Sequence, residues 1–333
     1  MGNCYSQKSG TINDSPRPTH QEINGIPQPP HQEINGSPQS TPPVNFKIKP
    51  RNIPATEIKK LQDFASGTGG LGDVWMCSWS PQSQAGTSKV AVKAVRVPQA
   101  NDIKLVATTS KRIRREAYVW ITLEHDNILT FSGVVDGFGP LPSLVSPWME
   151  NGSLDSYLKR GHVLSKTEKL RMLRQMAAGL KYLHDKGVVH GDLTCTNVLI
   201  DDDGKLHLAD FGLSMILTES QNTTFNSCHP GNARWMAPEM LATPEEGKVV
   251  MPTKAADVYS YGCIMLQLFC GHVPYHWLTQ AYHVIGARLS GTVPFRQFTD
   301  VEDGHKEYSL KCISVNVRDR PEASGIVDFL GSE

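Results

Sequence analysis

The chain has 333 residues, a length that suggests one large domain or two lobes with extensions. Its lysines plus arginines and its aspartates plus glutamates both number 33, so the formal net charge is zero and no basic face for a nucleic-acid partner is indicated. The seven cysteines are scattered, odd in number and without a CxxC pair, which favours a reducing compartment and argues against a zinc site or a disulfide framework.

The first 54 residues differ in composition from the rest of the chain. They contain ten of the 22 prolines and few aliphatic or aromatic residues, so they bury too little apolar surface to offset the entropy of ordering. We therefore expect residues 1–54 to form a disordered tail. Within it, segments 20–28 and 31–39 nearly repeat. We interpret them as a duplication in a tolerant linker, with a partner-docking motif as the alternative.

The extreme N-terminus, MGNCYS, fits the pattern for N-myristoylation, with Gly2 after the initiator methionine and Ser6 in the favoured position. One myristoyl chain binds membranes only marginally, and palmitoylation of Cys4 would supply the second signal that stable anchoring needs. No apolar secretory core follows Met1, and the longest apolar run, residues 261–275, suits a buried helix better than a membrane span. We expect a cytoplasmic protein attached to the membrane surface by a lipid anchor; a chance match is the alternative.

The folded region is expected to begin at about residue 58 with a glycine-rich hairpin. Its glycines, Gly67, Gly69 and Gly72, follow a GxGxxGxV spacing that ends at Val74, and they would let the backbone approach phosphate oxygens closely. The same spacing occurs in dinucleotide-binding folds, but there a helix follows the glycines directly. Here the continuation DVWMCSWS is strand-like, which favours a hairpin that covers a nucleotide.

A lysine then occurs within an apolar strand, KVAVKAVRV, residues 89–97. Burying Lys93 would be costly without anionic partners, and phosphates together with a carboxylate would provide them. In the next segment Ile113, Ala117 and Trp120 recur at helical spacing, and Glu116 lies beside this apolar stripe. We expect Glu116 to pair with Lys93; an ordinary solvent-facing glutamate is the alternative.

Together, the glycine hairpin, the strand lysine and the helix glutamate resemble the small lobe of a eukaryotic protein kinase. The resemblance covers about residues 60–330 and implies a two-lobed α+β kinase fold over residues 58–333. The small lobe, residues 58–146, would be an antiparallel sheet with one main helix, and the larger lobe, residues 150–333, would be mostly helical. The resemblance also implies ATP and Mg²⁺ as cofactors, with Lys93 holding the α- and β-phosphates and Glu116 holding Lys93.

The segment LVSPWMENGSLDSYL, residues 144–158, resembles the hinge between the kinase lobes. The resemblance implies that Ser146 is the small residue behind the adenine and that backbone groups of Pro147 to Met149 bind the adenine edge. The apolar residues that would sandwich the adenine ring are Val74, Ala91 and Leu199.

The stretch VVHGDLTCTNVLI, residues 188–200, resembles the kinase catalytic loop. By this resemblance Asp192 accepts the proton of the substrate hydroxyl, Asn197 holds a magnesium ion, and Asp210 of the DFG motif is the second metal ligand. Phosphoryl transfer needs positioning and neutralisation of charge more than covalent chemistry, which suits two carboxylates and an amide. The stacked apolar column that ties the two lobes together would consist of Trp120, His190 and Phe211.

The HGD triplet, with glycine after the histidine, also resembles small-molecule phosphotransferases that modify antibiotics and choline. Three downstream motifs favour a protein kinase. Residues 233–240, ARWMAPEM, resemble the end of an activation segment, residues 254–275 resemble the buried helix that anchors it, and Arg320 is expected to pair with Glu239. In this interpretation Asp257 is an N-terminal cap of that helix.

Two further positions depart from the protein-kinase pattern. Thr194 replaces a lysine that contacts the transferring phosphate, and Asn232 replaces a threonine that bonds the catalytic aspartate and that lysine. Both members of one network change while the metal and phosphate groups persist, so we expect an active enzyme. A pseudokinase scaffold that binds nucleotide and signals by conformation is the alternative. Gly191 removes the usual cationic receptor of an activation-loop phosphate, so activity should not depend on phosphorylation there.

The motifs say less about which amino acid accepts the phosphate and about the binding partners. RWMAPE and DVYSYGCIMLQL resemble the tyrosine-kinase-like group, whose members mostly phosphorylate serine and threonine. We therefore expect a serine/threonine kinase of protein substrates in membrane-associated intracellular signalling. No partner domain fits within the tail, so partners would be found through the tail or through membrane placement.

Overall fold

The computed structural model describes seven segments of the chain. They are residues 49–68, 72–82, 86–96, 101–211, 232–241, 250–298 and 301–332, with backbone alone at positions 112, 115 and 116. Gly2, Cys4, Gly69 and both copies of the tail repeat lie outside these segments, as do residues 212–231, which begin with the glycine of the DFG motif and end before Asn232. Within the described segments, no helix is long and apolar enough to cross a membrane.

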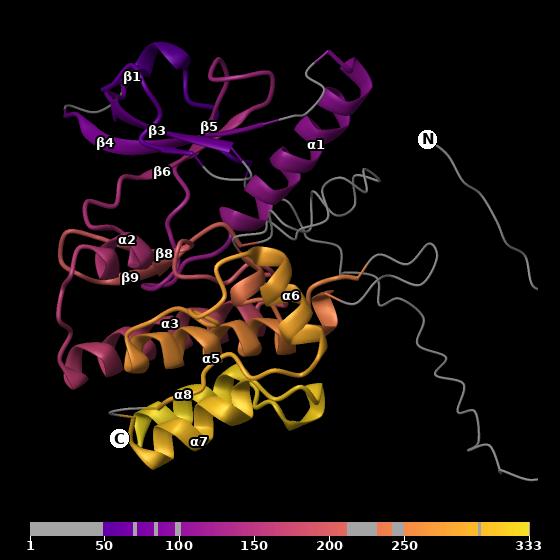
Figure 1. The fold of residues 1–333 in the computed structure, drawn as a ribbon. Coiled ribbons are helices and arrows are strands. Elements are labelled where there is room, and N and C mark those ends of the chain that lie inside the picture. The colour runs from indigo at the N-terminus through magenta and orange to yellow at the C-terminus, as the bar shows by residue number, and fades with distance from the viewer. Residues whose placement is uncertain are drawn as a thin grey trace, which may run out of the picture. The chain divides into compact units, whose positions relative to one another are not determined.

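An antiparallel sheet forms the N-terminal part of the described chain (Figure 1). Its strands follow the order β1-β3-β4-β6-β5, and β2 pairs with β3 as the glycine-rich hairpin. The strands are β1 (Ile58–Lys60), β2 (Gly67–Thr68), β3 (Gly72–Trp79), β4 (Ser88–Val95), β5 (Gly133–Val135) and β6 (Ser143–Pro147). The β3–β4 register places Val74 opposite Lys93, and the β4–β6 register places Ala91 opposite Ser146. The predicted glycine loop, Lys93 and the start of the predicted hinge therefore lie on neighbouring strands of one sheet.

Helix α1 (Ile103–Trp120) runs beside this sheet (Figure 1). It begins after Asp102, whose side chain accepts a hydrogen bond from the backbone N–H of Leu105, a donor that would otherwise lack a partner. Its buried face includes Ile113 and Ala117, which pack in one cluster with Leu144 of the sheet. The predicted apolar stripe is therefore confirmed as the face that joins helix to sheet.

The rest of the described chain is mainly helical, with one small sheet. The helices are α2 (Leu154–Lys159), α3 (Lys166–Asp185), α5 (Lys254–Cys270), α6 (Ala281–Leu289), α7 (Asp303–Cys312) and α8 (Ala323–Gly331). The small sheet has the order β7 (Gly152–Ser153), β8 (Val198–Ile200), β9 (Leu206–Leu208). Short 3₁₀ helices are η1 (Ala55–Glu57), η3 (Asn232–Arg234), η4 (Pro238–Leu241) and η5 (Val317–Asp319). The predicted α+β fold with a sheet lobe and a helical lobe is confirmed.

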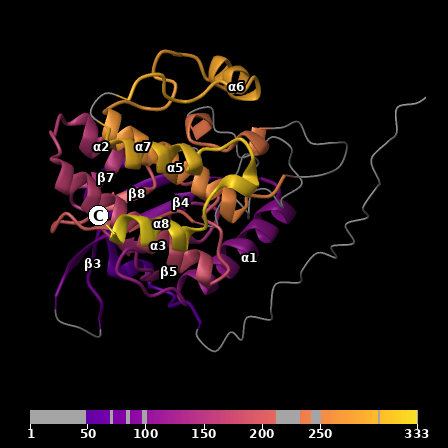
Figure 2. The same ribbon diagram turned by 90° about the horizontal axis from the view of Figure 1, so that it is seen from below.

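Helix α5 is the centre of the helical lobe. Fourteen of its 17 residues are buried, which is typical of a helix that is apolar on all sides. It packs against α3 and α7, and α3 packs against α8, so that these helices lie together in both views (Figures 1 and 2). The prediction of a buried helix for the longest apolar run is confirmed by Tyr261, Cys263, Ile264 and Leu266, all fully buried.

The folded region begins earlier than predicted. The Ile53 N–H donates to the Val134 carbonyl at 2.8 Å, and the Val134 N–H donates to the Arg51 carbonyl at 2.9 Å. The Ile53 side chain is only 4% exposed and belongs to the core on one face of the sheet. The start of the folded region therefore lies several residues before the boundary that we expected after residue 54. Proline-rich composition suggested a disordered tail up to that point, and the composition does not indicate that Ile53 is buried and paired with Val134.

Candidate active site

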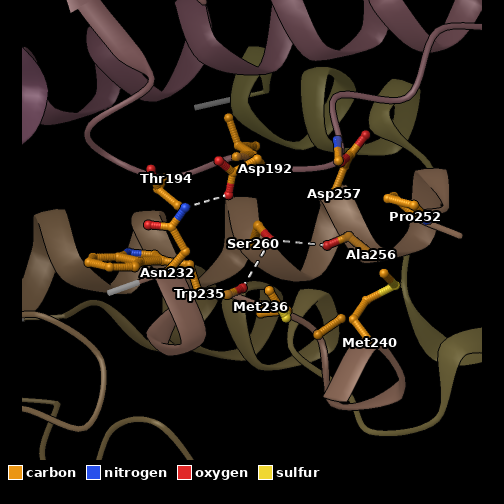
Figure 3. A pocket seen from close by; sticks show the side chains of 13 residues that line it. Asp192, Thr194, Asn232, Trp235, Met236, Met240, Pro252, Ala256, Asp257 and Ser260 are labelled. Carbon is orange, nitrogen blue, oxygen red and sulfur yellow. Dashed lines mark hydrogen bonds between the residues drawn. The ribbon is translucent and has the colours of Figure 1, made fainter. Parts of the chain in front are cut away.

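The loop between α3 and β8 holds the predicted catalytic aspartate. The Nδ2 of Asn232 donates to Oδ1 of Asp192 at 2.7 Å, and the Nδ2 of Asn197 donates to Oδ2 at 3.1 Å. Figure 3 shows the Asn232 amide turned toward the Asp192 carboxylate. The Asn197 amide also donates to the Asp192 backbone carbonyl at 2.8 Å. Each carboxylate oxygen of Asp192 is thus oriented by its own amide donor.

Of the two departures from the kinase pattern in this loop network, only Asn232 contacts the aspartate. Thr194 is buried, and its hydroxyl is hydrogen-bonded to that of Thr196 at 2.7 Å. No hydrogen bond joins Thr194 to Asp192 in the described part of the chain. The expected link between Asn232 and the catalytic aspartate is therefore present, and Thr194 takes no direct part in it.

The environment of Asp192 favours proton uptake. Burial raises the pKa of its carboxyl group to about 7, and the negative charge of Asp210 adds to this rise. The hydrogen bonds from Asn232 and Asn197 and the positive charge of Lys93 oppose it. A carboxylate with this raised proton affinity is suited to accept the proton of a hydroxyl group.

A cavity lies against Asp192, between the catalytic loop, η3 and α5 (Figure 3). Its volume of about 20 Å³ has room for about one water molecule. At its floor the Ser260 hydroxyl donates to the Trp235 carbonyl at 2.9 Å and to the Ala256 carbonyl at 3.2 Å. The cavity is therefore a gap in the packing beneath the site, and its walls join the segment after Asn232 to helix α5.

Asp257 holds the catalytic loop in place, which corrects its predicted role as a helix cap. The cap of α5 is Thr253, whose side chain accepts from the Ala256 N–H. The buried carboxylate of Asp257 instead accepts from the backbone N–H groups of His190 and Gly191, both at 2.8 Å. It also contacts Nε2 of His184 at 2.9 Å. A buried carboxylate with three partners fixes the backbone immediately before Asp192.

Gly191 has a conformational reason to be glycine. Its backbone φ is +78°, in the left-handed region that residues with a Cβ adopt only at a cost. The Asp257 hydrogen bond to its N–H holds it in this conformation. The missing cation that we noted at this position is therefore accompanied by a backbone requirement for glycine, which no local sequence pattern indicates. The activation-loop serines and threonines, whose independence from phosphorylation we expected, lie outside the described residues.

Lys93 of β4 pairs with the aspartate of the DFG motif. Its Nζ lies 2.5 Å from Oδ2 of Asp210, and the two side chains are 16% and 26% exposed. Asp210 has a left-handed φ of +60°, which is unusual for a residue with a side chain and often marks a functional site. The side chain of Glu116 lies outside the described part of α1, so its pairing with Lys93 stays a prediction.

The residues predicted to bind magnesium have suitable atoms left over. Mg²⁺ prefers oxygen ligands and usually binds one or two carboxylates together with substrate phosphates. Asn197 uses its Nδ2 as a donor to Asp192, which leaves its amide oxygen for a cation. Asp210 contacts Lys93 through Oδ2, which leaves Oδ1. This donor set fits a magnesium ion bound by Asn197 and Asp210.

The predicted apolar column is present. The rings of Trp120 and Phe211 meet edge to face with centroids 5.6 Å apart, and those of Phe211 and His190 do so at 6.2 Å. His190 is fully buried, and burial lowers its pKa so that the ring is uncharged at neutral pH. The Trp120 indole N–H donates to the Leu129 carbonyl at 2.7 Å. The column connects α1 with the catalytic loop through the residue after Asp210.

Several predicted nucleotide-binding residues lie on the sheet and the hinge. Gly72 has a structural role as well, because a Cβ there would lie 2.1 Å from the Ala94 carbonyl oxygen. At the hinge the Trp148 N–H donates to the Lys89 carbonyl at 3.1 Å, while the Met149 carbonyl accepts from the Gly152 N–H at 3.0 Å. The Met149 carbonyl is therefore occupied, and its backbone N–H is the group that could bind a ligand. The other predicted residues described are Gly67, Val74 and Ala91 on the sheet and Leu199 on β8.

The predicted ion pair near the end of the activation segment is confirmed. The two terminal nitrogens of Arg320 donate to the two oxygens of Glu239 at 2.6 and 2.8 Å. Arg320 also donates to the carbonyls of Ser314 and Ala255, and its side chain is fully buried. This arginine therefore joins η4 to the start of α5 and to the segment before η5.

Comparison with known proteins agrees with this geometry. The family model for protein tyrosine and serine/threonine kinases matches residues 62–330. Mitogen-activated protein kinase kinase kinase 1 of Arabidopsis thaliana is 35% identical over 208 residues, 62% of this chain and 32% of the relative. Serine/threonine/tyrosine-protein kinase HT1 of the same plant is 30% identical over 243 residues, 72% of this chain and 59% of the relative. Ephrin type-A receptor 5 of Rattus norvegicus is 32% identical over 241 residues, 70% of this chain and 23% of the relative.

The chain thus spans less than two thirds of the length of each of these relatives. The family match runs from the start of the glycine hairpin to α8 and contains every predicted catalytic residue in the expected order. The family match and the Glu239–Arg320 pair agree with the protein-kinase interpretation and not with the alternative of a small-molecule phosphotransferase. The chain belongs to the protein kinase family.

Proposed function

We propose that this protein transfers the γ-phosphate of ATP to serine and threonine hydroxyls of protein substrates. The observation that carries the proposal is the Asp192 carboxylate, oriented by Asn232 and Asn197. Lys93 and Asp210 contact each other, and the charges of both act on the Asp192 carboxylate. The residues proposed to hold phosphate, hold metal and accept the proton thus include Lys93, Asp210, Asn197 and Asp192, and this supports the proposal of an active enzyme over a pseudokinase.

The proposed reaction is an in-line displacement. The substrate hydroxyl oxygen bonds to the γ-phosphorus, the bond from that phosphorus to the β–γ bridging oxygen breaks, and ADP leaves. Asp192 orients the hydroxyl and receives its proton, and Lys93 would hold the α- and β-phosphates. Asn197 and Asp210 would hold a magnesium ion, which would supply positive charge to the phosphate oxygens. The Asp257 hydrogen bonds keep the backbone before Asp192 in place during transfer.

Serine and threonine are the proposed acceptors on two grounds. One is the likeness of the RWMAPE and DVYSYGCIMLQL motifs to the tyrosine-kinase-like group. The other is that the relative HT1 is named as a serine/threonine/tyrosine kinase. The test is incubation of the purified chain with radiolabelled ATP and magnesium on mixed peptides, followed by phosphoamino-acid analysis, with Asp192→Ala as the control. Nucleotide binding without any transfer would favour the pseudokinase scaffold, and phosphotyrosine as the main product would overturn the acceptor assignment.

We also propose that the protein acts at a membrane surface in intracellular signalling. The support is the MGNCYS start, with Gly2 for myristate and Cys4 for palmitate. Two acyl chains would give the stable attachment that a single one does not. A lipid anchor would concentrate the kinase beside substrates at the same surface.

A further inference from the structure

The segment from Gly271 to Phe298, which we call the α6 segment, carries only one sign of charge. Its 28 residues contain two arginines and three histidines and no aspartate or glutamate. The remainder of the chain has equal numbers of acidic and basic residues to within two, so the bias is local. Exposed Tyr282 at 67%, Leu289 at 58% and Val293 at 53% add apolar surface on the same segment. Of the two arginines, Arg288 is buried and Arg296 is exposed, so the segment presents one exposed positive charge beside apolar side chains, a combination typical of a binding face.

Within this segment, Arg296, Trp277 and two histidines form one cluster, which we call the Trp277–Arg296 patch. The Arg296 guanidinium lies over the Trp277 ring at 4.2 Å. The His276 ring meets Trp277 edge to face at 5.2 Å, and the His272 ring lies 3.9 Å from that of His276. Arg296 and His276 are exposed. Stacking on an aromatic face leaves the edge of a guanidinium available for bidentate hydrogen bonds to a carboxylate.

The positive charge of the patch is not neutralised by its neighbours. No carboxylate in the described segments lies within ion-pair distance of Arg296. Partial burial lowers the pKa of His276, and the charges of His272, Arg234 and Arg296 lower it further. The His276 ring is therefore uncharged at neutral pH, and the positive charge of the patch comes from the exposed Arg296. An exposed guanidinium without an intramolecular ion pair favours contact with an anionic group from another molecule.

Two arginines connect this segment to the catalytic aspartate. Arg234 donates to the carbonyls of Pro274 and Tyr275 at 2.9 and 2.7 Å. From α6, the buried Arg288 donates to the carbonyl of Ala233. Ala233 and Arg234 directly follow Asn232, whose amide holds Asp192, in the single turn η3. The patch therefore has a fixed position relative to the group that orients the acceptor hydroxyl.

We propose that the Trp277–Arg296 patch binds aspartate or glutamate side chains of the protein substrate, so that this kinase prefers an acceptor residue with acidic residues near it in sequence. The inference rests on the proposed function and adds its substrate class. Arg296 supplies the bidentate contact to the carboxylate, Trp277 holds the guanidinium flat, and His276 donates a further hydrogen bond. The two arginines that brace the segment set the distance from the bound carboxylate to Asp192.

The test is a set of serine peptides that share one neutral sequence. Glutamate is placed singly at each of four positions before and after the serine, and lysine replaces it in a matched set. We expect at least one glutamate position to raise kcat/KM tenfold or more over the neutral peptide, and the lysine at that position to lower it. Arg296→Glu should remove this preference, as should Arg296→Gln in case the charge reversal perturbs folding. The thermal unfolding midpoint of each variant checks the fold.

Arg318→Glu is the matched control, because it makes the same charge change on exposed η5, outside the α6 segment. It should keep both the basal rate and the glutamate preference. Transfer without any glutamate preference, or a preference that Arg296→Glu and Arg296→Gln leave intact, would overturn the inference while the proposed function stands. A preference for phosphoserine at the same positions but not for glutamate would overturn the carboxylate assignment.

Binding is measured separately from transfer, so that failure of the two proposals can be told apart. Fluorescence anisotropy is measured for every glutamate peptide of the set, and at least one should bind Arg296→Glu tenfold or more weakly than the wild type while its binding to Arg318→Glu is unchanged. If no peptide is phosphorylated but this difference is found, the proposed function fails and the patch remains a binding site for acidic peptide. Equal binding by both variants, or binding to anionic vesicles or to a second copy of the chain in place of the peptide, would refute the inference.

Discussion

Replacement of Asn232 is the most direct test of the departures from the kinase pattern. In Asn232→Ala the 2.7 Å hydrogen bond to Oδ1 of Asp192 is lost, while the 3.1 Å bond from Asn197 to Oδ2 persists. The carboxylate is then free to rotate away from the position that orients the hydroxyl. Asn232→Asp has the same shape but replaces the donor with an acceptor and a second negative charge. Asn232→Thr keeps a donor on a shorter side chain.

The expected magnitude follows from the kind of bond removed. A hydrogen bond to a charged group contributes about 1.5–3 kcal/mol. Because Asn197 still holds one oxygen, we take the lower part of this range, about 1.5–2 kcal/mol, which corresponds to a roughly 10- to 30-fold decrease in kcat. The decrease in kcat should be larger for Asn232→Asp than for Asn232→Ala, because the new carboxylate repels that of Asp192. Asn232→Thr should retain the most activity of the three.

The assay is steady-state peptide phosphorylation by the full chain at saturating ATP and magnesium. The KM for ATP should change little, because Asn232 contacts Asp192 and neither Lys93 nor Asp210. Thermal unfolding midpoints of all variants confirm that η3 is intact. The reasoning is refuted if Asn232→Ala keeps its kcat within threefold of the wild type, or if Asn232→Asp is as active as Asn232→Thr.

Four further changes test separate parts of the structure. Gly191→Ala should lower the free energy of unfolding by about 1–2 kcal/mol, because φ is +78° there, and an unchanged denaturant midpoint would contradict this. Arg320→Leu should lower the free energy of unfolding by about 3 kcal/mol, the lower end of the range for a broken buried ion pair, because its partner Glu239 is 29% exposed. Calorimetry measures this loss, and a decrease of less than about 1 kcal/mol would argue against a stabilising pair. Asp210→Asn should weaken magnesium–ATP binding in a nucleotide titration whereas Asp192→Ala should not, and the reverse order would exchange their assigned roles. Gly2→Ala should shift the protein from the membrane to the soluble fraction, and a wild type already soluble would contradict lipidation.

Much of the site could be predicted from local sequence features. The apolar run in α5 predicted a buried helix because a helix without a polar face has to be covered on all sides. The spacing of Ile113, Ala117 and Trp120 predicted the face of α1, since side chains three or four residues apart share one side of a helix. The order of glycines, Lys93, Asp192, Asn197 and Asp210 predicted the family, which the match over residues 62–330 confirms.

Other features depend on contacts between residues far apart in the chain. Asp257 was predicted to be a cap because a carboxylate near the start of a helix usually has that role, and nothing near it in sequence points to the loop 66 residues away that it holds. Likewise the 2.5 Å contact of Lys93 with Asp210 joins residues on different lobes. The sequence could place a lysine in a buried strand, but not choose between two carboxylates as its partner.

The sequence by itself determined which elements form, which faces they bury and which chemical groups are available, because periodicity and motif spacing are local properties of the chain. Only the tertiary structure decided how those groups meet. The early start of the fold at Ile53, the support of Asp192 by Asn232 and the bracing of the α6 segment by Arg234 and Arg288 each need two or more distant segments to converge. Such convergence is set by the packing of the whole core around α5, and no single stretch of sequence contains it.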